Sequence, residues 1–303
     1  MRLPSRRTFL KTIAGSAASL AGLGGYAFAV EPGFRLRVQR YALTPPAWPH
    51  DFSLTIAALA DIHVGEPHMS LDRVAAIVEA TNGLGADLVV LLGDYVAGHR
   101  WVTRSITMRE FAPVAAGLKA PLGVHAVLGN HDWWDDRTAQ RLGRGPVIAA
   151  RELMEAGVLT LENEAVRLVH DGRPFWLLGL GDQIALLRRP RLVGVDDLPG
   201  TVAKITDDAP AILLAHEPDI FPKVPARIAL TLSGHTHGGQ VRVFGYSPVV
   251  PSRYRNRYAY GHVREGGRDL VVSGGLGTSI APVRLGVPPE IVLIELGQPP
   301  APT

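Results

Sequence analysis

The chain has 303 residues, of which 47% are hydrophobic and 19% are charged, a balance that excludes an intrinsically disordered protein. It contains no cysteine, so disulfides and thiolate metal sites are excluded, and any metal ion must be held by His, Asp, Asn or Glu side chains or by water. The formal net charge is +3, but four basic residues and no acidic residue precede Glu31. The rest of the chain is therefore nearly neutral, and no nucleic-acid partner is expected.

Residues 1–30 have the pattern of an export segment. The stretch Ser5-Arg-Arg-Thr-Phe-Leu-Lys11 precedes an apolar run from Thr12 to Val30 that is rich in Ala and Gly. It resembles a twin-arginine signal, and Ala27-Phe28-Ala29 resembles a cleavage site. About 18 residues also suffice to span a bilayer, so a removed signal and a retained anchor both stay open. Either one predicts the twin-arginine export machinery as a partner and a location in the periplasm or on the outer face of the cytoplasmic membrane. A retained anchor adds membrane association through the N-terminus.

The prolines of residues 31–52 predict an extended lead-in. A domain over 53–297 and a proline-rich tail over 298–303 follow. Short apolar runs predict strands buried on both faces at 54–59, 88–92, 124–128, 175–180, 212–214, 230–232, 270–272 and 291–294. Ser70 is placed to cap a helix that ends near Gly83. Pro146 suits the first turn of another helix that Gly157 stops. Strands that alternate with helices predict a layered α/β fold.

Five of the predicted strands lead directly into side chains that can bind metal. The runs are followed in turn by Asp61 and His63, by Asp94, by Asn130 and His131, by His216, and by His235 and His237. Ligands of open α/β sheets bind beyond the carboxyl ends of the strands, so these segments predict one shared site. Residues two apart in extended backbone point the same way, which would let Asp61 and His63 hold one ion. Carboxylate and imidazole ligands suit Mn, Fe or Zn.

These residues form five ordered blocks: Asp61-Ile-His63, Gly93-Asp94, Gly129-Asn130-His131-Asp132, a lone His216, and Gly234-His235-Thr236-His237. The set resembles the calcineurin-like metallophosphoesterases. The stretches Gly238-Gly239-Gln240, 250–254 and 273–278 resemble the exported YkuE-like branch of that family. The resemblance implies a four-layer αββα sandwich of two mixed sheets flanked by helices, with a dinuclear metal site at the carboxyl ends of strands.

The resemblance also implies a role for each motif residue and a reaction. It assigns Asp61, His63 and His237 to one metal ion, Asn130, His216 and His235 to a second, Asp94 to both, His131 to the leaving group or phosphoryl oxygen, and Asp132 to the orientation of His131. The implied cofactors are two divalent or trivalent ions, with Mn, Fe and Zn as candidates. The implied reaction is hydrolysis of a phosphodiester, phosphomonoester or pyrophosphate by a hydroxide that bridges the ions.

Export and the YkuE-like resemblance together favour a small or lipid-linked envelope phosphate as the substrate. The run Gly93–Arg100 lacks the Asp and Arg that follow Gly-Asp in the protein serine/threonine phosphatases of this superfamily, so a phosphoprotein substrate is not expected. The alternative function is a non-catalytic scaffold with the same fold. The complete ligand set and His131 favour the enzyme.

Several residues outside the motif admit two interpretations. Asp182 is interpreted as a turn residue rather than a cleft residue. Trp133 and Trp134 suit either core packing or a substrate wall. The basic run at Arg253, Arg255 and Arg257 is interpreted as a solvated loop rather than a phosphate contact.

Overall fold

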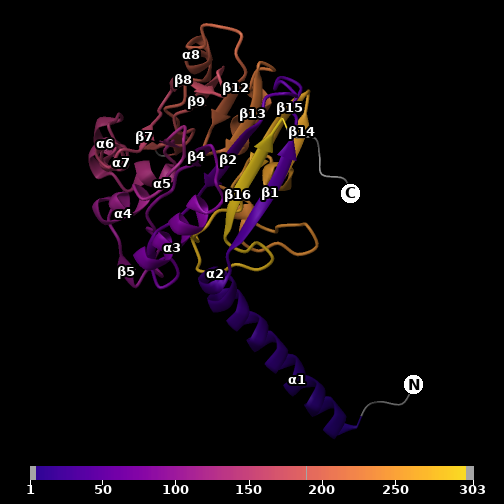
Figure 1. The fold of residues 1–303 in the computed structure, drawn as a ribbon. Helices are drawn as coiled ribbons and strands as arrows, with labels where there is room; N and C mark the ends of the chain where they lie inside the picture. The colour runs from indigo at the N-terminus through magenta and orange to yellow at the C-terminus, as the bar shows by residue number, and fades with distance from the viewer. Residues whose placement is uncertain (1–4, 189, 298–303) are drawn as a thin grey trace.

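Two six-stranded mixed sheets are stacked in the computed structural model, which describes residues 5–188 and 190–297 (Figure 1). The order in the first sheet is β1 (Arg37–Leu43), β16 (Glu290–Leu296), β2 (Leu54–Leu59), β4 (Leu88–Leu91), β6 (Val124–Ala126) and β7 (Leu159–Thr160). The order in the second is β14 (Gly261–Glu265), β15 (Arg268–Val272), β13 (Ile228–Ser233), β12 (Ala211–Leu214), β9 (Arg173–Gly179) and β8 (Glu164–His170). Two small antiparallel pairs lie outside them, β3 (Gly65–Glu66) with β5 (Arg104–Ser105) and β10 (Leu186–Arg188) with β11 (Arg191–Val193).

The central strands are apolar throughout because both of their faces are buried. In β2, Leu54, Ile56 and Ala58 point into a core between the two sheets, which they share with strands of the second sheet. The alternate residues Ala57 and Leu59 point into a second core beneath the helices. This division follows from the two-residue period of a strand, and it is the reason that continuous apolar runs predicted these strands correctly.

Helices complete the outer layers. On the first sheet lie α3 (Leu71–Asn82), α4 (Met108–Ala115) and α7 (Ile148–Glu155), and on the second lie α8 (Leu198–Ala203) and the 3₁₀ helix η2 (Pro218–Lys223). Four short helices remain in the connections: α5 (Asn130–Trp134), α6 (Arg137–Leu142), η3 (His237–Gly239) and η4 (Arg255–Tyr258). The predicted four-layer αββα sandwich is therefore confirmed.

The two predicted helices differ in their outcome. The first is confirmed, since α3 has Ser70 as its N-cap and Gly83 as its C-cap. The second begins two residues after Pro146, so the placement of that proline in the first helical turn was wrong. The side chain of Asp136 accepts a hydrogen bond from the backbone N–H of Ile148 (2.9 Å). This contact from a distant residue fixes where α7 begins, and no local signal predicts it.

The prediction of an extended lead-in over 31–52 was wrong in part. Residues Glu31–Phe34 form the short helix α2, and β1 pairs in parallel with β16 along its whole length. The first sheet therefore begins well before residue 53. β1, β8 and β14 are all edge strands with partly exposed, alternating side chains. A search for continuous apolar runs misses such strands because only one face of each is buried. The tail at 298–303 lies outside the described residues.

A long helix precedes the sandwich and projects away from it (Figure 1). It comprises α1 (Arg6–Gly25), a π-helical turn, η1 (Tyr26–Val30), and α2. The stretch Arg6–Phe34 is long and apolar enough to cross a membrane, and little of it is buried against the rest of the protein. β1 runs parallel to β16 and β16 runs antiparallel to β2. The helix therefore joins the sandwich at the edge where β2 reaches its carboxyl end.

Candidate metal centre

The predicted metal ligands lie in tight turns after the strands. Asp61, His63, Asp94, His235 and His237 all have positive φ angles, between 42° and 66°, a region that non-glycine residues rarely adopt. The expectation that Asp61 and His63 lie on extended backbone was therefore wrong. They still face one centre because the turn is held by hydrogen bonds to the next strand. The N–H of Asp61 donates to the carbonyl of Gly93, and the N–H of His63 donates to the carbonyl of Asp94, both at 3.0 Å.

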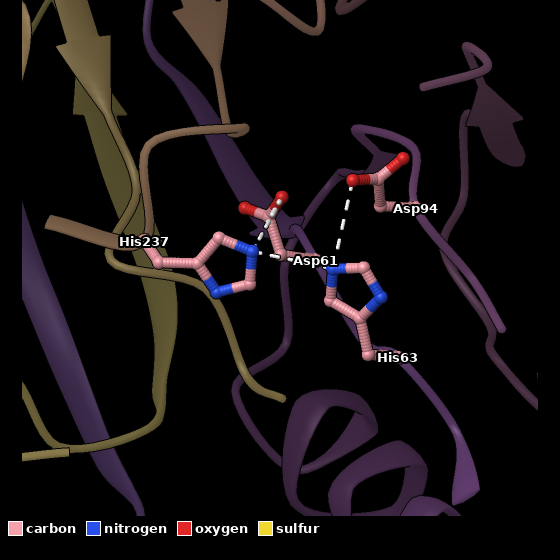
Figure 2. A group of neighbouring side chains, drawn as sticks. All are labelled: Asp61, His63, Asp94 and His237. Carbon is pink, nitrogen blue, oxygen red and sulfur yellow. Dashed lines mark hydrogen bonds and ion pairs between the residues drawn. The ribbon is translucent and has the colours of Figure 1, made fainter. Parts of the chain in front are cut away.

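The structure brings the predicted ligands together in two groups. Asp61, His63, Asp94 and His237 form one group, shown in Figure 2, and Asp94, His216 and His235 form the other; within each group the potential ligand atoms lie within 4.8 Å of one another. Asp94 belongs to both groups, as expected of a bridging carboxylate. The Oδ1 atom of Asn130 lies 2.9 Å from Nδ1 of His235, next to the second group. All seven predicted metal ligands thus meet at one place.

The distances within the centre suit ligands that converge on ions. In the first group, Nε2 of His63 is 3.2 Å from Nε2 of His237 and 3.5 Å from Oδ2 of Asp94. In the second, Nε2 of His216 is 3.3 Å from Oδ2 of Asp94. The Nδ1 atoms of His216 and His63 lie 2.6 Å and 3.3 Å from the carbonyl oxygens of Leu92 and Val96. Bonds of this kind fix the tautomer and leave Nε2 to bind metal.

Burial makes this cluster unfavourable without a cation. Oδ2 of Asp61 is buried and makes no hydrogen bond, which is costly for a polar atom. Burial raises the pKa of Asp61 to about 7. Burial also lowers the pKa of His63 to about 3 and lowers the pKa of His237 well below its usual range. His216 differs, since burial opposes its protonation but the charge of Asp94 raises the pKa of His216 well above its usual range. Imidazoles and carboxylates are the donors that a divalent ion binds, with release of any proton they carry, so these residues fit a metal centre.

Asp94 is charged in spite of its burial. Burial opposes ionisation, but the nearby imidazoles of His216, His131 and His63 lower the pKa of Asp94 well below its usual range. Its Oδ1 also accepts a hydrogen bond from the backbone N–H of His131 (2.8 Å). A fixed anion between the two ligand groups is the arrangement that a bridging position requires.

One glycine makes the close packing of the turns possible. A Cβ at Gly129 would lie 2.6 Å from Cε1 and 2.7 Å from Nε2 of His216, and would overlap the carboxylate of Asp94. A residue with any side chain would displace both ligands. The glycine before Asn130 is therefore required by the approach of the backbone to the centre.

His131 belongs to neither ligand group and lines the cavity beside them. It is half-buried, and its ring centroid lies 5.1 Å from that of His63 and 5.2 Å from that of Trp134. Its Nε2 lies 3.4 Å from the hydroxyl of Ser279. The imidazole is thus next to the centre and open to a bound molecule, as expected for a residue that acts on substrate rather than on metal.

Asp132 has a different role from the one expected. Its Oδ2 accepts hydrogen bonds from the backbone N–H groups of Asp94 (2.9 Å) and Gly129 (2.8 Å), and its Oδ1 accepts one from Tyr95 (3.1 Å). Both oxygens are therefore engaged by backbone, so Asp132 does not orient the ring of His131. It joins the two turns that carry Asp94 and Asn130.

The sequence motifs did not reveal two other features of the centre. Arg284 is fully buried, and a guanidinium nitrogen lies 3.5 Å from Nδ1 of His237. Asp182 forms the predicted turn, since Oδ1 accepts from the N–H of Ile184 (2.8 Å). It is also buried against Glu217, and burial together with the charge of Glu217 raises the pKa of Asp182 well above its usual range. Only the position of Glu217, next to His216, hinted at this carboxyl pair.

A cavity of about 470 Å³ opens above the centre. Its floor includes Asp94, Asn130, His131, His235 and His237. Its walls are mainly apolar and come from two loops and one indole: Trp134, Val241, Pro248, Val249, Pro251, Ile280, Ala281 and Val283. Of the tryptophan pair, Trp133 is buried in the core and Trp134 forms part of the wall. Of the basic run, Arg257 is paired with Glu265 (2.6 Å), whereas Arg253 lines a second pocket together with Trp134 and His235.

The fold and the centre define a class of protein, namely a metal-binding α/β sandwich whose ligands come from the carboxyl ends of strands in both sheets. Residues 54–239 match the family model described as calcineurin-like phosphoesterase. The chain belongs to this family and is a metal-dependent phosphoesterase.

Individual relatives agree with this assignment. The chain is 29% identical to the uncharacterized metallophosphoesterase YkuE of Bacillus subtilis, over 98% of this chain and 99% of that protein. It is 30% identical to the phosphodiesterase YaeI of Escherichia coli, over 96% and 99%. It is also 29% identical to a transmembrane protein with metallophosphoesterase domain from Danio rerio, over 81% of this chain and 53% of that protein.

Proposed function

We propose that the chain hydrolyses a phosphodiester, phosphomonoester or pyrophosphate bond at a centre of two metal ions, on an envelope substrate that is small or lipid-linked. One observation carries the proposal. Two ligand groups share Asp94, and His131, which binds in neither, lines the cavity directly beside them. A scaffold would need none of these three features.

The chain's own residues supply binding, charge and a proton. The first ion would be held by Asp61, His63, Asp94 and His237, and the second by Asp94, Asn130, His216 and His235. Mn, Fe and Zn all suit these oxygen and nitrogen ligands. The chemistry that such ions supply when bound is Lewis acidity, which makes hydroxide available near neutral pH and neutralises charge on phosphoryl oxygens.

His131 is the residue placed to act on the substrate itself. Its imidazole lies at the cavity floor, outside both ligand groups, where it can donate a proton to the leaving oxygen or hydrogen-bond to a phosphoryl oxygen. A contribution of about 10²–10⁴ in rate is typical of such a group. Asp132 acts one step away by joining the two turns, and the apolar cavity walls limit the access of water.

The proposed substrate class rests on the cavity and on the N-terminal helix. Apolar walls over a phosphate-binding floor suit a phosphate attached to a lipid or another apolar group. The helix Arg6–Phe34 carries Arg6, Arg7 and Lys11 at its N-terminal end, away from the domain. Basic residues remain on the cytoplasmic side of a membrane, so a helix inserted in this orientation would leave the phosphoesterase domain outside, in the periplasm or on the outer face of the cytoplasmic membrane. The YkuE and YaeI relatives match over almost their whole length, which is consistent with a shared architecture.

Hydrolysis of bis(p-nitrophenyl) phosphate and p-nitrophenyl phosphate with added Mn²⁺ tests the proposal. We expect turnover by the native chain, and for His131→Ala an unchanged metal content with turnover lowered by about 10²–10⁴. Elemental analysis of both proteins should give two ions per chain. Metal-loaded protein that hydrolyses neither ester would favour the scaffold instead. Full activity of His131→Ala on an ester with a poor leaving group would show that the residue has another role.

A further inference from the structure

The two loops that line the cavity also carry exposed apolar side chains. Phe244 is completely exposed, Ile280 is 79% exposed, Val249 is 70% exposed and Tyr246 is 62% exposed. Val249 and Ile280 also belong to the cavity wall. Single exposed apolar residues are common on soluble proteins, but several of them on loops that line a binding site indicate a surface that is covered when the protein works.

Phe244 is also unfavourable for the backbone that carries it. It lies with Gly245 at the tip of a two-residue turn between Val243 and Tyr246, which exchange backbone hydrogen bonds at 2.9 and 3.0 Å. Phe244 and Gly245 have φ angles of 50° and 79°, as in a type I′ turn, for which Asn-Gly is the preferred pair. A bulky residue is disfavoured in this conformation. Among the described residues nothing buries its ring, so its presence stabilises nothing within the chain.

This surface is continuous with the end of the N-terminal helix. The segment that contains Val241 and Val243 pairs with the segment before β16, through the N–H of Arg242 and the carbonyl of Leu285 (2.8 Å). The next residue on that segment, Arg284, donates its backbone N–H to the carbonyl of Ala27 (2.9 Å). The side chain of Glu31, buried to 2% exposure, accepts the N–H of Val287 (2.8 Å). The cavity loops and the helix end are thus tied together.

The same contacts favour retention of the helix. Ala27 is 5% exposed and lies before the point at which a signal peptidase would cut after Ala29. Removal of the signal would break the Ala27–Arg284 bond and uncover the loop beneath His237. Phe28 and Phe34 flank this segment and are themselves exposed, by 52% and 82%, where the helix meets the domain.

We propose that the retained helix anchors the protein in the membrane and that the loop tips insert into the outer leaflet of the same membrane. The inserted residues are Val243, Phe244, Tyr246, Val249 and Ile280. The occupant of this surface is a lipid bilayer, and the mouth of the cavity then opens into the interface between lipid and water. The helix and the loop tips meet that interface together because they lie at the same edge of the sandwich. If the proposed function holds, this arrangement has a consequence for the substrate. The substrate enters from the leaflet by its apolar part while its phosphate reaches the metal centre.

Site-specific labelling tests the proposal directly, because the chain has no cysteine of its own. The full-length Phe244→Cys variant is labelled with an environment-sensitive fluorophore and reconstituted in vesicles of equal parts phosphatidylethanolamine and phosphatidylglycerol. We expect a blue-shifted emission and quenching by nitroxide lipids. Val169→Cys is the matched control, since Val169 is 53% exposed at the opposite end of the second sheet, and its label should remain accessible to iodide in water. Equal iodide accessibility at the two positions would overturn the proposal.

Phe244→Asn separates docking from folding. Asn is favoured in the type I′ turn, so the variant should unfold at a higher temperature than the native chain. When Phe244→Asn is introduced into a chain labelled at Tyr246→Cys, quenching of the label by nitroxide lipids should decrease. Hydrolysis of soluble bis(p-nitrophenyl) phosphate should stay unchanged. Undiminished quenching would contradict the role of Phe244. Lipid contact in a protein that hydrolyses no ester would overturn the proposed function alone, whereas hydrolysis without lipid contact would overturn the docking proposal alone.

Discussion

Replacement of Asp132 by Asn should weaken the metal centre although no predicted metal ligand is replaced. Asp132 accepts three backbone N–H bonds, two at Oδ2 and one at Oδ1. The amide of Asn keeps one acceptor oxygen, so at least one buried N–H must face an NH₂ group. An unsatisfied buried donor costs about 1–3 kcal/mol. Because the bonds that remain are no longer charge-assisted, we expect the free energy of unfolding to fall by about 2–4 kcal/mol.

The loss of metal affinity in Asp132→Asn should exceed the loss expected from a decrease in folding stability alone. The three N–H groups belong to Asp94, Tyr95 and Gly129, so their release loosens the turn of the shared carboxylate and the turn that leads to Asn130. Loss of an outer hydrogen bond of this kind typically lowers metal affinity or activity by about 10–100-fold. Isothermal titration of the metal-free protein with Mn²⁺ measures the first quantity, and ester hydrolysis at saturating Mn²⁺ measures the second.

Asp136→Asn is the matched control. Asp136 is buried and also accepts three backbone N–H bonds, from Thr138, Ala139 and Ile148, each at 2.9 Å. It lies four residues further along the chain and joins α6 to α7 rather than the metal turns. It should lose similar stability but keep its Mn²⁺ affinity. Equal losses of metal affinity in the two variants, or native affinity in Asp132→Asn, would refute the assignment of Asp132 as a residue that positions the turns.

Three further substitutions test other parts of the structure. Gly129→Ala would bring a methyl group within 2.7 Å of Nε2 of His216, and equilibrium dialysis should show the loss of at least one ion. Arg284→Met leaves buried carbonyls without their donor, and urea denaturation should show a loss of about 3 kcal/mol. Hydrogen bonds from Trp176 and Arg167 lower the pKa of Asp207 to about 2. Its stabilising contribution is therefore complete above about pH 4 and is lost toward pH 2, and thermal unfolding of Asp207→Asn should lack that part of the acid dependence.

The sequence was sufficient to predict the doubly buried strands and the ligands that follow them. Both depend on local pattern: an apolar run without alternation marks a strand covered on two faces, and a polar residue just after it marks the carboxyl end. The runs before Asp61, Asp94 and His216 illustrate this, since each is a central strand of its sheet. The meeting of these ends could be inferred because ligands of such sheets bind at that edge.

The remaining features depend on contacts that no short segment contains. β1 was missed because an edge strand has one exposed face and because its partner, β16, lies about 250 residues further along the chain. Arg284 lies far from every motif, and only the folded loop brings it to His237. The role of Asp132 was assigned incorrectly because its sequence neighbour His131 suggested a partner, whereas its actual partners are backbone groups on two turns.

Local sequence patterns do not predict the backbone at the metal centre, because the convergence of the ligands determines it. Five of the predicted ligands occupy positive φ, and Gly129 leaves no room for a Cβ. Oδ2 of Asp61 is also buried without a hydrogen-bond partner. Each of these features is unfavourable for an isolated fold, and together they are concentrated where seven donor atoms converge. The same reasoning applies at the cavity mouth, where Phe244 is both exposed and conformationally disfavoured. In both places the chain departs from what folding alone would select. A metal ion accounts for the departure at the centre, and the proposed contact with lipid would account for it at Phe244.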